Sequence, residues 1–141
     1  MRNRGGSGGS TLPAVKIFRP HPSALFEIRR FVREQAEMHR VSERVASDVV
    51  LAVSEASANC MLHSSTREIR VRWRMNGPCV EVEIQDDGVF YEHVPMPEVD
   101  GRGGHGIPLM TALADELDIR KGTSRSPGTT VRLVKCEPEE D

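Results

Sequence analysis

The stretch VASDVVLAVSEASANC, residues 45–60, is the most informative segment of the chain. Its apolar residues recur every three or four positions, which is the spacing of one face of an α-helix. They are Val45, Val49, Ala52, Val53, Ala56 and Cys60. Ser42 stands where an N-cap is expected, and Asp48, Glu55 and Asn59 lie at the margin of the apolar face. The stretch therefore predicts a helix that buries one face and carries polar groups beside it.

The residues before this helix predict a strand and another helix. Residues 14–19 alternate, with Val15 and Ile17 on one side, which favours a short strand. Ser23 is the expected N-cap of the helix that follows. The apolar positions of that helix again recur at three and four residues: Leu25, Ile28, Phe31, Val32 and Ala36.

The residues after it change to a period of two. Apolar residues alternate with charged ones over 68–75 and over 80–84, and Asn-Gly-Pro at 76–78 supplies a turn, which predicts an antiparallel hairpin with one buried face. The charged residues of the first strand are Arg70, Arg72 and Arg74. An arginine stripe could mark a nucleic-acid surface, but Glu81 and Glu83 lie on the same face of the second strand. Ion pairs across the hairpin are the favoured interpretation.

The C-terminal part predicts a long loop, a third helix and two more strands. Residues 86–106 are rich in glycine and lack a hydrophobic period, which favours a loop. The helix after it has the apolar stripe Leu109, Met110, Leu113 and Leu117. Ile119 marks one strand and residues 129–133 another. We therefore predict an α+β fold, a two-layer α/β sandwich with three helices on one face of a mixed, mostly antiparallel sheet.

Composition limits the class of protein. The chain has 141 residues, with 19 Lys and Arg against 21 Asp and Glu, a formal charge of −2. One domain is expected at residues 13–136, after a flexible Gly/Ser-rich lead at 1–12 and before an acidic tail at 137–141. A direct nucleic-acid binder would usually carry excess positive charge, so this class is disfavoured. No apolar run approaches the roughly 20 residues of a membrane-spanning helix, and no membrane association is expected.

The cysteines predict neither a disulfide nor a zinc site. Cys60, Cys79 and Cys136 are odd in number, widely spaced and without a C-x-x-C pair. We expect reduced thiols in a cytoplasmic protein.

Two groups of polar residues could carry chemistry. Glu55 and Asn59 are four residues apart on one helical stripe, so they offer a carboxylate suited to a base and an amide oxygen suited to a hard cation. A solvated helix margin is the ordinary alternative. Asp86 ends a strand and is followed by Gly88, an arrangement that lets a carboxylate accept a hydrogen bond from a ligand. An Asp-Gly turn without a ligand would look the same.

Two glycine-containing segments complete the set. Residues 102–106, Arg-Gly-Gly-His-Gly, lead into a helix, where backbone N–H groups can meet an anion, although a ligand-free hinge is equally compatible. Residues 127–130, Pro-Gly-Thr-Thr, open the last strand. Each segment is weak evidence alone, and it is their order along the chain that discriminates.

That order resembles the ATP-binding fold shared by gyrase, the MutL repair proteins, heat-shock chaperones and sensor histidine kinases, called GHKL or Bergerat-type. The likeness extends over about residues 14–135 and is greatest to the stand-alone anti-sigma-factor serine kinases. LAVSEASANCMLHSS (51–65) is similar to their N-box, S-E-A-x-x-N-x-x-x-H. QDDGVF (85–90) and RGGHGIPLM (102–110) resemble the two glycine boxes, and PGTTVRL (127–133) resembles the closing strand.

The resemblance implies a role for each matching residue. Glu55 would be the catalytic base that takes the proton of a protein serine, and Asn59 would ligate Mg²⁺ at the ATP phosphates. Asp86 would bind the adenine amino group within the box that contains Gly88, supported by Thr129. The residues expected at the phosphates are Arg102, Gly104 and Gly106. His63 also matches, but it is expected to pack the helix end.

The implied function is that of an anti-sigma factor with ATP- and Mg²⁺-dependent serine kinase activity. Its expected partners are a sigma factor, an anti-anti-sigma factor of the STAS type that it phosphorylates, and a second copy in a homodimer. Phe90 departs from the family pattern, because it replaces the second glycine of the first box. His105 and Pro108 are further departures. A non-catalytic or weakly nucleotide-binding partner-switching module is therefore the alternative.

Overall fold

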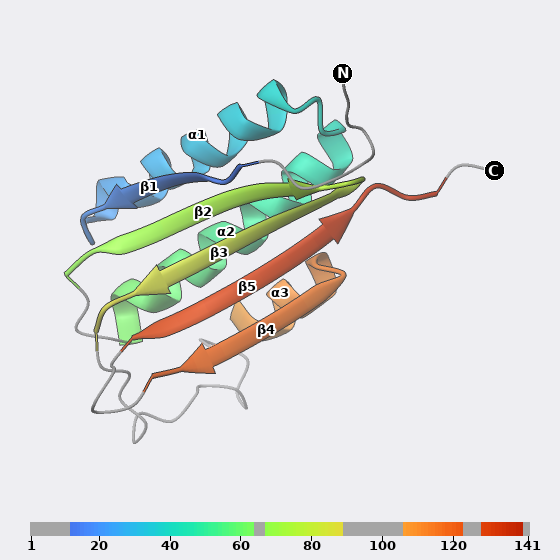
Figure 1. The fold of residues 1–141 in the computed structure, drawn as a ribbon. Coiled ribbons are helices and arrows are strands. Elements are labelled where there is room, and N and C mark those ends of the chain that lie inside the picture. The colour runs from blue at the N-terminus through green and yellow to red at the C-terminus, as the bar shows by residue number, and fades with distance from the viewer. Residues whose placement is uncertain (1–11, 64–66, 89–105, 123–127, 140–141) are drawn as a thin grey trace.

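Three helices cover one face of a five-stranded sheet in a computed structural model of the chain (Figure 1). The structure describes residues 12–63, 67–88, 106–122 and 128–139. Its elements in chain order are β1 (Ala14–Phe18), α1 (Pro22–Met38), α2 (Glu43–His63), β2 (Ile69–Asn76), β3 (Cys79–Asp86), α3 (Gly106–Leu113), β4 (Glu116–Lys121) and β5 (Thr129–Cys136). The strand order is β1-β2-β3-β5-β4, and each neighbouring pair is antiparallel. The predicted two-layer sandwich is confirmed, and its described strands form a wholly antiparallel sheet.

The apolar stripes of the helices meet the apolar face of the sheet in one core. Alternate residues of β2 and β3 point into this core, as the period of two predicted. The largest fully buried side chains are Trp73, Ile28, Ile69, Ile84 and Met110. Within the described parts of the chain, none of the helices is long and apolar enough to cross a membrane.

The two long helices begin at different kinds of cap. Ser42 caps α2 as predicted, because its Oγ accepts a hydrogen bond from the Val45 N–H at 3.3 Å. The expected Ser23 cap of α1 is wrong. His21 is the N-cap, and its Nδ1 accepts from the Ser23 N–H at 3.2 Å. Pro22 explains the shift, since proline fits the first helical position, where no N–H is needed.

The third helix is shorter than its apolar stripe suggested. We expected Leu117 on the helix, but α3 ends at Leu113 and Leu117 lies in β4. The chain leaves the helix because the Asp115 N–H donates to the Val134 carbonyl at 2.7 Å, which begins the pairing of β4 with β5. A hydrophobic residue four positions after the last helical leucine fits the pattern of either element.

Cys79 and Cys136 form a disulfide bond, so the expectation of three reduced thiols is wrong. The two residues are direct partners in the register of β3 and β5. Their separation of 57 residues produces no local motif, and only the crossover that makes β5 a neighbour of β3 brings them together. Cys60, the third cysteine, is buried on α2.

The open face of the sheet carries the predicted ion pairs. Arg72 lies opposite Glu83, with 3.9 Å between nitrogen and oxygen, and Arg74 lies opposite Glu81 at 2.9 Å. Arg132 on β5 also contacts Glu81 at 2.9 Å. Burial of Glu81 acts to raise its pKa, but hydrogen bonds from both arginines outweigh it, and the pKa lies below the usual value.

Replacing Glu81 by Gln should lower the free energy of unfolding by about 1–2 kcal/mol at neutral pH, because two arginines lose a largely buried acceptor. A lowered folded-state pKa stabilises the protein above the unfolded-state pKa, and this contribution disappears as the pH falls through the folded-state value. The difference in free energy of unfolding between wild type and the variant should therefore become smaller in acid. Urea unfolding at pH 7 and at pH 3 measures both effects.

Glu83→Gln is the matched control, because its ion pair is longer and more exposed. We expect it to cost at most about 0.5 kcal/mol. Equal losses in the two variants would contradict a special role for Glu81.

Candidate functional site

Asp86 and Thr129 face each other where β3 ends and β5 begins. Oδ1 of Asp86 accepts hydrogen bonds from the Gly88 N–H at 3.0 Å and from the Thr129 N–H at 3.3 Å. Only 2% of Asp86 and 5% of Thr129 is exposed. Backbone donors from two segments thus fix one oxygen of a buried carboxylate.

The other side-chain oxygens of this pair have no hydrogen-bond partner among the described residues. Oδ2 of Asp86 and Oγ1 of Thr129 are buried, and neither makes a hydrogen bond with any residue that the structure describes. Leaving a buried polar atom unpaired costs about 1–3 kcal/mol, so such atoms in a native fold call for an explanation. A ligand that donates an N–H hydrogen bond to the Asp86 carboxylate would explain the unpaired atoms.

Cys60 connects helix α2 to this end of the sheet, because its buried thiol lies beside the Asp86 carboxylate and each group shifts the pKa of the other. Burial raises the pKa of Asp86, and the neighbouring charge of Asp87 adds to the effect, while the Cys60 thiol and the N–H groups of Gly88 and Thr129 oppose it. Burial and the nearby Asp86 carboxylate raise the pKa of the Cys60 thiol. The sequence indicated only that Cys60 is part of the buried stripe.

Glu55 and Asn59 lie in the half of α2 that ends beside Asp86. Asn59 is adjacent to Cys60, and Glu55 is one turn earlier, about 6 Å along the helix axis. Both side chains are half-buried. Figure 1 shows the C-terminal end of α2, the arrowhead of β3 and the start of β5 gathered together. The fold therefore brings Glu55 and Asn59 to the end that contains Asp86, Gly88 and Thr129.

The described residues include only part of the predicted phosphate-binding segment. Gly106 is the first residue of α3, a helix that packs against α2. Arg102 and Gly104 lie outside the described residues, as do Phe90 and His105. His63 is the last residue of α2, and its side chain also lies outside them.

Gly128, which the sequence marked only as part of the Pro-Gly-Thr-Thr segment, is a structural requirement of the site. Its φ is +126°, and a Cβ built on it would lie 2.6 Å from the backbone oxygen of Asp86. Glycine therefore allows the start of β5 to approach the end of β3 closely. The sequence feature that could have indicated this role is the position of Gly128 directly before Thr129.

Comparison with known proteins identifies the family of the chain. The sequence model of the histidine kinase-like ATPase domain matches residues 18–135. The chain belongs to this family. The match spans the N-box, both glycine boxes and most of β5, so the resemblance inferred from the ordered motifs is confirmed.

Curated relatives in this family include an anti-sigma F factor of Thermoanaerobacter sp. (strain X514), which is 28% identical over 111 residues. A second is the anti-sigma F factor of Caldanaerobacter subterraneus subsp. tengcongensis, at 29% identity over 111 residues. Each alignment covers 71% of this chain and 76% of the relative.

Among solved structures, the chain is similar to the crystal structure of the RsbU and RsbW domains of Rv1364c from Mycobacterium tuberculosis. The TM-score is 0.69 at 20% sequence identity, over 89% of this chain and 32% of that one. This chain thus spans about a third of the compared protein. The comparison supports the histidine kinase-like ATPase fold.

Replacing Gly128 by Ala should destabilise this ATPase-family domain by about 2 kcal/mol or more, because the new Cβ collides with backbone and the positive φ disfavours an L side chain. Relief of the collision should also separate Thr129 from Asp86. Thermal unfolding and nucleotide titration together measure the two effects.

Gly77→Ala provides the control. Gly77 has a φ of +61° and lies in the β2–β3 turn, at the other end of the hairpin from Asp86. Its substitution should cost about 1–2 kcal/mol of backbone strain and leave nucleotide affinity unchanged. A loss of affinity in both variants would contradict the local role of Gly128.

Proposed function

We propose that this chain is an anti-sigma factor with ATP- and Mg²⁺-dependent serine kinase activity, which controls a sigma factor by phosphorylating an anti-anti-sigma partner of the STAS type. Two curated relatives named anti-sigma F factor support the regulatory part of the proposal. Membership of the histidine kinase-like ATPase family supports the use of a nucleotide.

The observation that carries the proposal is the buried pair Asp86 Oδ2 and Thr129 Oγ1, for which the described part of the chain offers no hydrogen-bond partner. The exocyclic amino group of adenine is an N–H donor that a carboxylate can accept, and a threonine hydroxyl can either donate or accept. Because Oδ1 of Asp86 is already held by backbone N–H groups, Oδ2 has a fixed direction. This end of the sheet thus fits the adenine edge of ATP.

The residues on α2 fit the phosphate end of the same nucleotide. Mg²⁺ is usually held in nucleotide sites by one or two protein oxygens together with substrate phosphates, so the single amide oxygen of Asn59 is an appropriate ligand. When bound, Mg²⁺ and ATP supply the phosphoryl group and the neutralisation of its charge. Arg102, Gly104 and Gly106 are proposed to contact the phosphates at the N-terminus of α3.

Glu55 is proposed to act as the base. Its carboxylate would accept the proton of the partner serine as that oxygen attacks, and its half-buried position on α2 leaves the side chain accessible to a docked protein. The fixed helix holds Glu55 and Asn59 on one stripe, which would orient the serine and the phosphates relative to each other.

The remaining parts of the proposal concern assembly and location. We propose a cytoplasmic homodimer that contacts its two regulatory partners directly and binds neither nucleic acid nor membrane. The near-neutral composition and the pairing of arginines with glutamates on the open sheet face support the exclusion of nucleic acid.

Transfer of labelled phosphate tests the proposal. The chain is incubated with γ-labelled ATP, Mg²⁺ and the partner that co-purifies with it from its native cell. We expect the label on one serine of the partner and no transfer when Mg²⁺ is chelated. Nucleotide binding without transfer to any native partner would remove the kinase and leave the partner-switching module, the alternative that Phe90 favours.

A further inference from the structure

The Cys79–Cys136 disulfide and the Asp86–Thr129 pair occupy opposite ends of the same ladder. β3 and β5 pair in register from Cys79 with Cys136 to Asp86 with Thr129. The disulfide therefore ties the two strands that together form the candidate adenine pocket. It closes a 57-residue separation that contains both glycine boxes.

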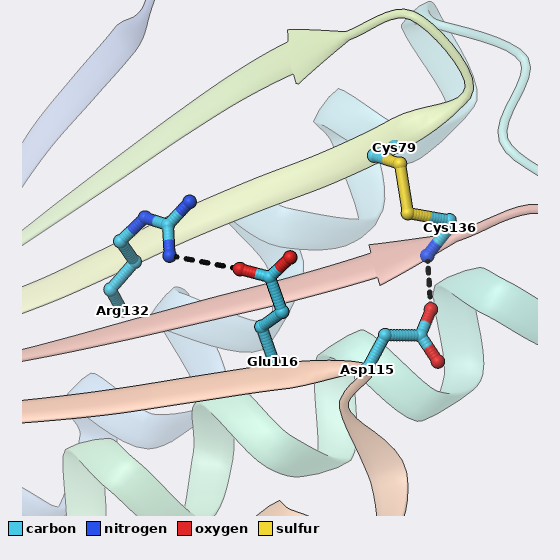
Figure 2. The surroundings of a disulfide bond; sticks show 5 residues. All are labelled: Cys79, Asp115, Glu116, Arg132 and Cys136. Atoms are coloured by element: carbon cyan, nitrogen blue, oxygen red, sulfur yellow. Dashed lines mark hydrogen bonds and ion pairs between the residues drawn. A yellow bond between two sulfur atoms is a disulfide. The ribbon is translucent and has the colours of Figure 1, made fainter.

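The disulfide end also fixes helix α3. The backbone N–H of Cys136 donates to Oδ2 of Asp115 at 2.7 Å, as Figure 2 shows, and the N–H of Asp115 donates to the Val134 carbonyl at 2.7 Å. Asp115 lies between α3 and β4. These two bonds attach the α3–β4 junction to β5 beside the disulfide.

The residue after Cys136 fixes helix α2 in the same way. The N–H of Glu137 donates to the carbonyl of Pro78 at 3.0 Å, and Oε2 of Glu137 accepts from the N–H of Ser42, the N-cap of α2, at 2.9 Å. Glu137, the first residue of the expected acidic tail, is thus bound to two other segments. Both helices that flank the candidate site are held by contacts beside one disulfide.

The two disulfide-bonded cysteines are more exposed than the third cysteine. Cys79 and Cys136 are half-buried at the ends of their strands, whereas Cys60 is 4% exposed with a raised thiol pKa. Thiol–disulfide exchange needs access to a sulfur, so Cys79 and Cys136 are the reactive pair. In a reducing cytoplasm such bonds are usually transient, and many are catalytic or redox-sensing.

We propose that Cys79–Cys136 is a reversible redox site, and that its reduction by a dithiol weakens nucleotide binding at the Asp86–Thr129 end. The inference rests on the proposed nucleotide site. One thiolate of the dithiol attacks one of the two protein sulfurs, which forms a mixed disulfide. The other protein sulfur leaves as a thiolate. The second thiol of the reductant then displaces the first protein sulfur. The dithiol becomes a disulfide, and its two electrons and two protons end on Cys79 and Cys136.

Alkylation after dithiothreitol treatment tests the exchange itself. Native oxidised protein should incorporate no alkyl group at Cys79 or Cys136, and treated native protein should incorporate one at each, as peptide mass spectrometry reports. Failure of the native fold to react while the urea-unfolded chain reacts would overturn the proposal.

Calorimetric titration with Mg²⁺ and ATP tests whether reduction weakens nucleotide binding. It compares the oxidised protein, the reduced protein and the double variant Cys79→Ser/Cys136→Ser. We expect affinity at least about five-fold weaker for the last two, a typical size for coupling between distant sites. Dithiothreitol should have no effect on the double variant. Equal affinities within two-fold, or a dithiothreitol effect that persists in the double variant, would overturn the proposal. If the double variant does not fold, reduced wild-type protein gives the comparison.

The redox proposal and the proposed function can fail separately. Oxidised protein that binds no ATP would contradict the nucleotide site. In that case, hydrogen exchange still tests the structural coupling: reduction should raise exchange at the start of α2 and at the α3–β4 junction. Unchanged exchange at both places would overturn the coupling itself.

Discussion

Replacement of Glu55 by Gln is expected to slow phosphate transfer to the partner serine by about 10²–10⁴-fold, which is the usual contribution of a positioned base. Glutamine has nearly the same size and hydrogen-bonding reach, but it cannot take up the serine proton. Because Glu55 is proposed to act on the partner and not on the nucleotide, ATP affinity should stay within about two-fold. Single-turnover transfer of labelled phosphate measures the first effect and calorimetry the second.

Glu37→Gln is the matched control, since Glu37 is an exposed glutamate on the neighbouring helix α1. It should transfer phosphate at the wild-type rate. Unchanged transfer by the Glu55 variant would show that another group accepts the proton. If the wild-type protein transfers no phosphate and the Glu55 variant still binds both partners, the result would instead favour the non-catalytic module.

Replacement of Asp86 by Asn is expected to weaken ATP binding by about 100-fold, the loss of one charge-assisted hydrogen bond of about 3 kcal/mol. The side-chain oxygen of Asn can still accept from the Gly88 and Thr129 N–H groups. Its NH₂ group would then occupy the place of Oδ2 and meet the adenine amino group donor to donor. Titration of both proteins with ATP measures the change.

The same variant should lose no stability at neutral pH. Burial raises the folded-state pKa of Asp86, so ionisation of this group costs stability as the pH rises through that value. Asn carries no charge and avoids the cost. We expect an equal or higher melting temperature than wild type at pH 7, and a smaller difference in acid, where Asp86 is protonated.

Asp87→Asn is the control for Asp86, because Asp87 is the next residue but serves a different segment. Its Oδ1 accepts from the Arg67 and Glu68 N–H groups at the start of the hairpin. ATP affinity should be unchanged in this variant. If both variants lost affinity equally, a general disturbance of the loop would explain the result better than a specific adenine contact.

The sequence predicted most of the fold because its periodicities are local. The alternation over β2 and β3 placed Val71, Trp73 and Val82 in the core, and the stripe on α2 placed Val45 and Val53 there. The motifs also predicted Glu55, Asn59 and Asp86 in the correct elements. These features depend on neighbours a few residues apart, which a single sequence contains.

The features that were missed depend on contacts between distant segments. Cys79 meets Cys136 only after β5 has inserted beside β3. Cys60 reaches Asp86 only when α2 lies across the sheet. Leu117 fits both a helix stripe and a strand until pairing with β5 decides between them. No periodicity or spacing in the sequence contains this information.

Comparison of the affinities for ATP and for GTP tests the nucleotide site most directly. A carboxylate acceptor at Asp86 suits the amino group of adenine, whereas guanine presents a carbonyl oxygen at the same place and would leave Oδ2 unpaired. Titration of oxidised wild-type protein with each nucleotide and Mg²⁺ should show one site per chain that prefers ATP by at least about ten-fold. Equal affinity for the two nucleotides, or no binding of either, would contradict the account.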